Sequence, residues 1–341
     1  MKHLLTSAAA IAIVASTGAA AFAADYTIGV SNTVQGNGWR EQMICAMRAQ
    51  AAAEGDVSGL IVAHRNTDSA GQLEDLNNLI EAGVDAIVLN PSNPEALNSA
   101  IDTAIEQGIV VVAVDAGVTA EGAYILSNNQ EEYAYLGAKW LFEQVGGSGD
   151  IVYMRGIAGV SADTDRDNGF QRALDEFPDI NVIHEVFTGW QQDQGKQQIF
   201  DFLATGIPFD GVWTSGIDNV IVDAFTESGA PLVPIVGADN AGFVQYLSEV
   251  EGLEGAAVTN PGSVGGAGIA LAVDILNGEA PDSNLVLVDP VLWENTTDDG
   301  RAIIMAAQNP NLDPEWPVSV TVPGWTDYSM EDIIACEGPG E

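Results

Sequence analysis

The chain has 341 residues, of which 47% are apolar, and this is enough to build more than one hydrophobic core. Its 49 acidic residues against 10 basic ones give a net charge of -39 at pH 7, which repels nucleic acids and anionic membrane surfaces. Nucleic-acid binding is therefore excluded, and the scattered acidic residues indicate a solvated acidic surface rather than an acidic tail.

The first 24 residues have the pattern of a cleavable export signal. A positive start at Lys2 precedes a short, alanine-rich apolar run, and Ala-Phe-Ala at 21–23 has the small residues that a signal peptidase needs. The apolar run is too short to span a bilayer permanently. We predict that residues 1–24 are a signal peptide, cleaved near Ala23 or Ala24, and that the mature protein is exported. An uncleaved N-terminal helix is the alternative.

Strands and helices alternate through the first half of the mature chain. Short β-branched or apolar runs are each followed by a polar turn and a segment with apolar residues at helical spacing. This alternation predicts a parallel sheet covered by helices. The predicted strands are residues 26–31, 60–63, 86–89 and 109–114, and the predicted helices are residues 39–54, 69–82 and 94–107.

Next to the first predicted strand, a polar turn leads into a helix. It places Asn37, Trp39 and Arg40 where the strand ends. An aromatic ring beside amide and guanidinium donors suits a polyhydroxylated ligand, because the ring stacks on the apolar face and the donors bind hydroxyls. The alternative is a helix cap with a buried tryptophan.

Two further strands end in an aspartate. Asp115 follows the buried run 110–114, and Asp239 follows 234–238. A carboxylate at such a place is costly unless it is hydrogen-bonded or faces a cleft. The pair therefore predicts opposite walls of one site, although either residue alone could be a helix N-cap.

After residue 127 the alternation starts again with a helix and predicts a second α/β lobe. No flexible linker separates the lobes, so a cleft between them is the expected ligand site. After the last helix the regular alternation is lost. The predicted strands are residues 151–154, 182–186, 211–214, 234–236 and 256–259, and the predicted helices are residues 131–145, 169–176, 194–204, 218–228, 242–250 and 264–276.

Arg166, one of only ten basic residues, lies among Asp163, Asp165 and Asp167. The spacing of these acids resembles the opening of a calcium loop, but Asn168 occupies the glycine position and the bidentate acid is missing. Calcium binding is thus not expected. Arg166 is either a surface ion-pair partner or a cleft residue that binds hydroxyls.

Trp190 and Trp213 follow in the second lobe, and Trp213 is expected in the core because it lies within a strand. We find no nucleophile elbow, phosphate-binding loop or dinucleotide fingerprint. The three histidines are dispersed. We therefore expect no catalytic residue, no cofactor and no metal site.

Only two cysteines occur, Cys45 and Cys336, and an exported protein meets an oxidising compartment. We predict a disulfide that fixes the C-terminal tail to the first helix. Two buried free thiols are the alternative.

Together these residues resemble the periplasmic sugar-binding proteins of ABC importers, of the ribose-binding and galactofuranose-binding type. The resemblance covers essentially the whole mature chain, and the string Gly-Trp-Arg at 38–40 looks like the galactofuranose-binding version. It implies an α/β fold of the type I periplasmic binding protein, with two Rossmann-like lobes whose parallel sheets are joined by a three-crossing hinge. The implied lobes are residues 25–128 plus 261–289, and residues 129–260 plus 290–341 with the tail.

The resemblance also implies a set of ligand-binding residues. The family's glutamine near the last crossing is replaced by Asn260, after Thr259, and Asp218 is the nearest residue to an Asn-Asp pair that the family often carries. The implied ligand-binding residues are Asn37, Trp39, Arg40, Asp115, Arg166, Trp190, Asp218, Asp239, Thr259 and Asn260.

Two departures from the family concern the ligand. In the family an arginine often follows the first strand-end aspartate, but here Ala116 follows Asp115. An aromatic residue often precedes the second strand-end aspartate, but here Ala238 precedes Asp239. These changes favour a different pentose, a hexose or a linear sugar alcohol over ribose.

The implied function is the solute-binding component of an ABC-type importer, a periplasmic and monomeric protein that presents a monosaccharide or polyol to a permease. A chemoreceptor is a further potential partner. The alternatives are a secreted carbohydrate-active enzyme, with Asp115 and Asp239 as its carboxylate pair, and a sugar-sensing ligand-binding protein.

Overall fold

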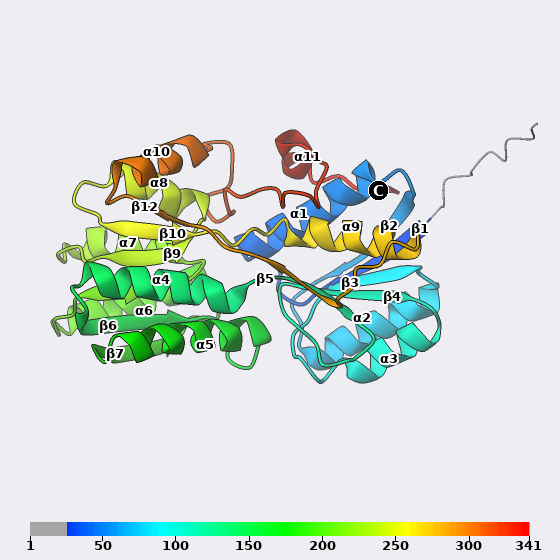
Figure 1. Ribbon diagram of the computed structural model, residues 1–341, viewed down its shortest axis with the longest axis horizontal. Coiled ribbons are helices and arrows are strands. Elements are labelled where there is room, and N and C mark those ends of the chain that lie inside the picture. Colours follow the sequence, from blue (N-terminus) through cyan, green and yellow to red (C-terminus); the bar gives the residue numbers. More distant parts are fainter. Residues whose placement is uncertain (1–25, 341) are drawn as a thin grey trace, which may run out of the picture.

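The computed structural model describes residues 26–340, so the predicted signal peptide lies outside the described residues. Figure 1 shows an elongated molecule in which two α/β lobes lie side by side. Each lobe contains one six-stranded sheet with helices on both faces. The two-lobed α/β fold predicted from the sequence is confirmed.

The sheet of the first lobe is entirely parallel, in the order β11-β5-β4-β3-β1-β2. Helices α1 and α9 pack on one face, and α2 and α3 pack on the other. The strands are β1 (Tyr26–Asn32), β2 (Val57–His64), β3 (Ala86–Asn90), β4 (Val110–Val114), β5 (Tyr124–Asn128) and β11 (Leu285–Val288). The helices are α1 (Gly38–Ala53), α2 (Ser69–Ala82), α3 (Asn98–Glu106) and α9 (Val264–Leu276).

The sheet of the second lobe has the order β12-β10-β9-β8-β6-β7, in which only the edge strand β12 is antiparallel. Helices α4 and α5 cover one face, and α6, α7, α8 and α10 lie on the other. The strands are β6 (Ser148–Arg155), β7 (Asp179–Phe187), β8 (Gly211–Trp213), β9 (Ile235–Ala238), β10 (Gly255–Val258) and β12 (Leu292–Glu294). The helices are α4 (Gln130–Gln144), α5 (Ser161–Glu176), α6 (Gln192–Ala204), α7 (Asp218–Ser228), α8 (Ala241–Glu249) and α10 (Asp298–Ala307).

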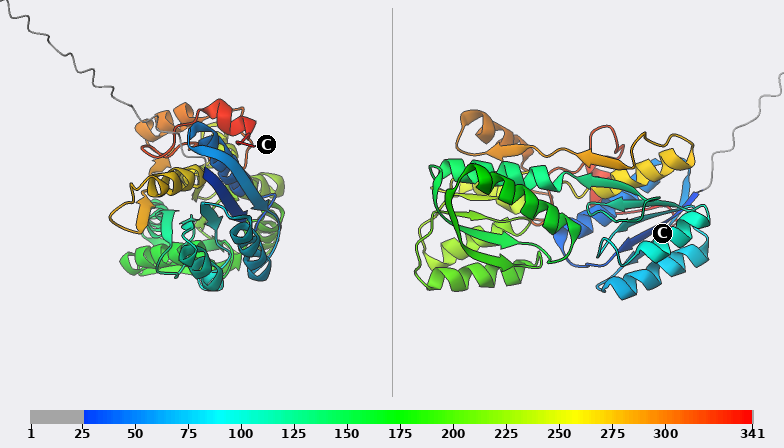
Figure 2. Two further views of the ribbon diagram at one scale, coloured as in Figure 1. Left: turned by 90° about the vertical axis from the view of Figure 1, so that its right-hand side faces the viewer. Right: turned by 60° about the horizontal axis from the view of Figure 1, so that its bottom comes forward.

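The chain passes between the two sheets after β5, after β10 and after β11. Figure 2 shows these connections from two further directions. The crossings also contact one another, because Asn128 Nδ2 on the first donates to the carbonyl of Pro261 on the second (3.2 Å). The exact boundaries between the lobes stay a prediction.

The structure differs from the sequence prediction in three places. Strand β5 was not predicted, and β11, β12 and α10 occupy the region in which no regular alternation was expected. Helix α5 begins at Ser161, so the acid-rich stretch around Arg166 is helical rather than a loop. Two of its acids pair with Arg155 of β6, whose Nη2 is 2.8 Å from Asp163 Oδ2 and whose Nη1 is 3.2 Å from Asp167 Oδ2.

The predicted disulfide is confirmed, and the alternative of two free thiols is wrong. Cys45 on α1 is bonded to Cys336, which directly follows the last helix, α11 (Met330–Ala335). Tyr328 and Ile333 are buried against α1 beside this bond. The end of the tail therefore packs on the first lobe, although the sequence grouped it with the second.

Candidate ligand-binding cleft

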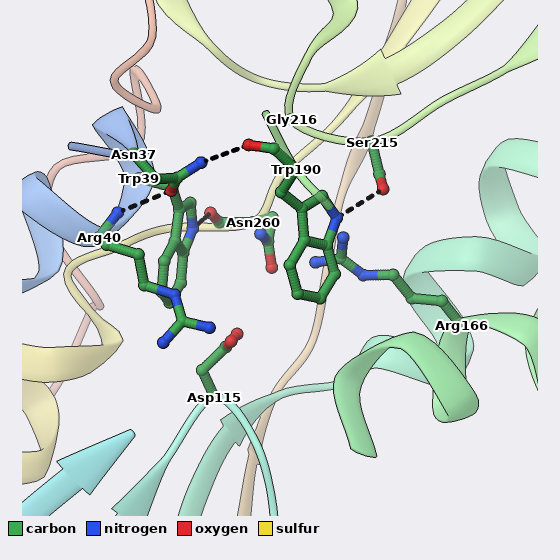
Figure 3. Close-up of a pocket in the computed structure, with 9 residues that line it drawn as sticks. All are labelled: Asn37, Trp39, Arg40, Asp115, Arg166, Trp190, Ser215, Gly216 and Asn260. Carbon is green, nitrogen blue, oxygen red and sulfur yellow. Dashed lines mark hydrogen bonds between the residues drawn. The ribbon is translucent and has the colours of Figure 1, made fainter. Parts of the chain in front are cut away.

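A pocket opens between the two lobes where loops at the carboxyl ends of strands from both sheets meet. Figure 3 shows that Arg40 and Arg166 enter it from opposite sides, with the carboxylate of Asp115 beneath two indole rings. Its cavity volume is about 40 Å³. The lining residues are Asn37, Trp39, Arg40, Asp115, Arg166, Trp190, Ser215, Gly216 and Asn260.

The start of α1 supplies three of these side chains. Asn37 is the N-cap, since its side chain accepts a hydrogen bond from the amide of Arg40 (3.1 Å). Its Nδ2 donates across the cleft to the carbonyl of Trp190 (2.9 Å), which belongs to the second lobe. Trp39 Nε1 donates to the carbonyl of Asn260 (2.7 Å). Asn37 is thus both a helix cap and a cleft-lining residue, whereas Trp39 is partly buried and lines the cleft, so the buried tryptophan of the alternative interpretation is wrong.

Arg40 is only 5% exposed, and its Nη1 donates to the side-chain oxygens of Asn32 (2.8 Å) and Asn90. Burial lowers the pKa of Arg40 to about 10; Asp115 opposes this shift and the nearby charge of Arg166 adds to it. Two guanidinium groups therefore share one small cleft.

Asp115 lies directly after β4 in a left-handed conformation, with φ of 65°. Its Oδ1 accepts a hydrogen bond from Gln130 Nε2 (2.7 Å), and Gln130 Oε1 accepts one from Arg166 Nε (2.7 Å). This relay connects the carboxylate of the first lobe with the arginine of the second through the first residue of α4. It holds both charged groups at fixed positions in the cleft wall.

Arg166 projects from α5, and its guanidinium lies over two aromatic rings. Its Cζ is 4.5 Å from the ring centroid of Tyr133 and 5.4 Å from that of Trp190. Such stacking suits a partly desolvated guanidinium. Arg166 is therefore a cleft residue, and the surface ion-pair alternative is wrong.

Trp190 forms the opposite aromatic wall and also has a left-handed backbone, with φ of 52°. Its Nε1 donates to Ser215 Oγ (3.3 Å). The ring lies so close to Gly156 that a Cβ there would be 2.1 Å from the indole. A glycine at 156 is thus required for this ring position.

The other sequence-predicted residues of the second lobe lie behind the cleft and do not line it. Asp239 is fully buried, where Oδ1 accepts from the amide of Asn260 (2.8 Å) and Oδ2 from that of Ser319 (3.2 Å). Thr259 Oγ1 accepts from the amide of Val291 (2.8 Å). Asp115 and Asp239 therefore do not form opposite walls, because Asp239 is fully buried and is not among the lining residues.

Asp218 is also fully buried behind the cleft. Its Oδ2 accepts from the amides of Gly216 (3.1 Å) and Ala238 (2.9 Å) and from Asn240 Nδ2 (2.7 Å), whereas Oδ1 has no partner. Burial raises the pKa of Asp218 to about 7, and these hydrogen bonds and Arg166 oppose the shift. Asp218 thus supports the lining residue Gly216 and does not itself line the cleft.

We expect Asp218→Asn to flatten the dependence of stability on pH. The pKa of Asp218 is higher in the folded state than in the unfolded state, so between about pH 4 and pH 7 the folded state binds a proton that the unfolded state has lost. The free energy of unfolding therefore decreases as pH rises through this range. The amide does not titrate and removes this fall. Urea unfolding of both proteins from pH 4 to pH 8 measures the difference. Parallel curves across this range would contradict the assignment.

Sequence reasoning missed four residues of this region. Ser215 and Gly216 line the cleft after β8, and Asn90 and Gln130 hold the charged groups in place. Asn90 is the last residue of a buried strand, just as Asp115 directly follows one. The position of Asn90 after an apolar run could therefore have identified it from the sequence. Gln130 gave no such signal because it lies in an ordinary first helical turn.

The site presents aromatic faces, two guanidinium groups, one carboxylate and side-chain amides. Aromatic faces are suited to stacking on a ring or carbon chain, and the polar groups are suited to binding several hydroxyls at once. Among residues 26–340, no group of three His, Cys, Asp or Glu side chains is arranged to hold a metal ion. In the same range no helix has the length and apolarity needed to cross a membrane. The fold and cleft define a two-lobed binder of small polar solutes.

Comparison with known proteins gives the family. The family model of the periplasmic binding protein domain matches residues 28–280. The chain therefore belongs to the periplasmic binding protein family. It is similar to the xylitol-binding protein of Mycolicibacterium smegmatis, with 29% identity over 241 residues that cover 68% of each chain. It is also similar to the ribose import binding protein of Escherichia coli, with 24% identity over 289 residues that cover 82% of this chain and 94% of the relative.

The fold agrees with solved structures of this family. An ABC transporter solute binding protein from Thermobispora bispora superimposes with a TM-score of 0.76 at 24% identity, and the match covers 86% of this chain and 90% of that one. This likeness shows the two-lobed fold independently of the site. The sequence-based recognition of the family is confirmed.

Proposed function

We propose that the protein is the solute-binding component of an ABC-type importer, which holds a monosaccharide or sugar alcohol between its lobes and delivers it to a permease. The relatives named above support this, because one binds xylitol and another serves ribose import. The observation that carries the proposal is the cleft, in which Trp39 and Trp190 accompany Arg40, Arg166 and Asp115.

We propose that the ten predicted ligand-binding residues divide into two groups. Seven line the cleft and contact the ligand, whereas Asp218, Asp239 and Thr259 support the lining segments from behind. In this proposal, closure is a hinge motion stabilised by ligand contacts with both lobes. The protein acts in the periplasm as a monomer after removal of residues 1–24, and it carries out no chemical step.

A carbohydrate-active enzyme is the less favoured function. A hydrolase of the usual kind needs two carboxylates that face one substrate. Asp115 lines the cleft, but Asp239 is fully buried with both oxygens bonded to amides. A chemoreceptor as an additional partner is compatible with the same binding site.

A thermal-shift screen of the mature protein tests the proposed function. We expect one group among pentoses, hexoses, their furanose forms and alditols to raise the melting temperature, because a ligand that binds only the folded state stabilises it. Xylitol, D-ribose and myo-inositol belong in the panel, and amino acids serve as the control group. No shift with any sugar or polyol, or a shift with amino acids alone, would contradict the proposal.

A further inference from the structure

The segment after α10 forms a connection between the lobes in addition to the three crossings. We call residues 312–336 the tail strap. On the second lobe, the amides of Ala241 and Gly242 donate to the carbonyls of Trp316 (2.8 Å) and Pro314 (2.9 Å). On the first lobe, Gln42 Nε2 donates to the carbonyl of Pro317 (2.7 Å). Figure 1 shows the result, with α10 above α8 and α11 above α1.

One side chain of the tail strap contacts the start of α1 directly. Glu315 Oε2 accepts a hydrogen bond from the amide of Gly38 (3.1 Å), the first residue of this helix. A carboxylate at this end is favourable because the first amides of a helix lack partners within it. Burial raises the pKa of Glu315, and the bond from Gly38 opposes this shift.

The packing at this contact is tight. A Cβ on Gly38 would lie 2.2 Å from Cβ of Glu315 and 3.0 Å from its carbonyl carbon. The start of α1 and the tail strap therefore fit together only with glycine at 38. A change at Glu315 acts first on the turn that carries Asn37, Trp39 and Arg40.

Glu315 also lies at the mouth of the cleft. It lines a second, outer pocket together with Asn37 and Trp190, the two residues that bond across the lobes. The same outer pocket contains Asp193 from the second lobe. The carboxylate is thus placed where residues of the two lobes meet.

We propose that Glu315 is a positioning residue of the ligand site, supplied by the tail strap. Through Gly38 it holds the turn in the orientation that lets Asn37 bond to Trp190 and Arg40 face the ligand. This inference rests on the proposed function, since it assigns a role in ligand binding. Its expected signature is faster ligand release, because the contacts at the cleft mouth form in the closed state.

Three variants of the mature protein test the inference: Glu315→Ala, Glu315→Gln and, as the control, Glu331→Gln. The control lies on the exposed surface of α11. Hydrogen exchange is measured first, without ligand, on a peptide that covers the first turn of α1. We expect about tenfold faster exchange there in Glu315→Ala, as for the loss of one charge-assisted hydrogen bond. Glu315→Gln keeps an acceptor oxygen but loses the charge, so its exchange rate should lie between those of the wild type and Glu315→Ala.

Stopped-flow tryptophan fluorescence with xylitol and with D-ribose then measures association and release. We expect Glu315→Ala to raise the release rate about tenfold and to change the association rate less than about twofold. Unchanged exchange at the first turn of α1, or unchanged release, would overturn the inference, as would equal effects of the alanine and glutamine variants. If neither xylitol nor D-ribose binds the wild-type protein, the proposed function is wrong for these two compounds. The hydrogen-exchange result still decides whether Glu315 positions the turn before α1.

Discussion

Asp115→Asn is expected to weaken ligand binding about 10-fold to 100-fold while the protein stays folded. Among residues 26–340, this carboxylate is the only acid that lines the cleft, and charge-assisted hydrogen bonds to it are stronger than those to an amide. Asparagine is the suitable replacement because it tolerates the left-handed backbone at this position, where φ is 65°. Isothermal titration with the ligand found in the screen measures the loss.

The same substitution should affect Arg40. Asp115 offsets part of the cost of burying that guanidinium, and Arg166 adds to the cost, so loss of the carboxylate lowers the pKa of Arg40 further. We expect a modest decrease in the melting temperature of the unliganded variant. Asp102→Asn, an exposed change on α3, is the matched control and should alter neither property. Wild-type affinity in Asp115→Asn would remove Asp115 from the site.

The double variant Cys45→Ala, Cys336→Ala is expected to lose about 3 to 5 kcal/mol of stability. The bond joins residues 291 positions apart, and closing so long a loop restricts the unfolded chain strongly. A loss of this size corresponds to a fall in melting temperature of about 5–10 °C for a chain of this length. Scanning calorimetry of the oxidised wild type and the variant measures the difference.

Reduced wild-type protein is the control for the disulfide variant, and it should melt at the temperature of the double variant. The folded tail should persist at low temperature, because Tyr328 and Ile333 remain buried against α1. Equal melting temperatures for the oxidised wild type and the variant would show that the disulfide does not stabilise the fold.

Much of this fold was predictable because parallel strands buried on both faces form continuous apolar runs. The strands 86–89 and 109–114 were predicted on this basis and correspond to β3 and β4. The edge strands β11 and β12 were not predicted. Their side chains are partly exposed, and pairing with β5 and β10 defines them. Strand β11 has a short apolar run, Leu-Val-Leu-Val at 285–288, but its position beside β5 depends on pairing that the run alone does not indicate.

The site was predictable where a polar residue follows an apolar strand. Asp115 was found in this way and lines the cleft, but the same pattern placed Asp239 in the site as well. Two amides, those of Asn260 and Ser319, bind the carboxylate of Asp239, and Ser319 belongs to the tail strap. The two cysteines predicted that the end of the tail is attached to α1. The rest of the tail has no regular pattern, so its approach to β9 could not be inferred.

The most direct test of the central claim is to let the mature protein select its own ligand. The protein is incubated with an equimolar mixture of pentoses, hexoses and alditols, dialysed, and examined by native mass spectrometry. The account predicts that wild-type protein retains one neutral sugar or polyol in a 1:1 complex and that Asp115→Asn retains much less of it. Retention of none of these compounds, or equal retention by both proteins, would contradict a sugar-binding or polyol-binding cleft at Asp115.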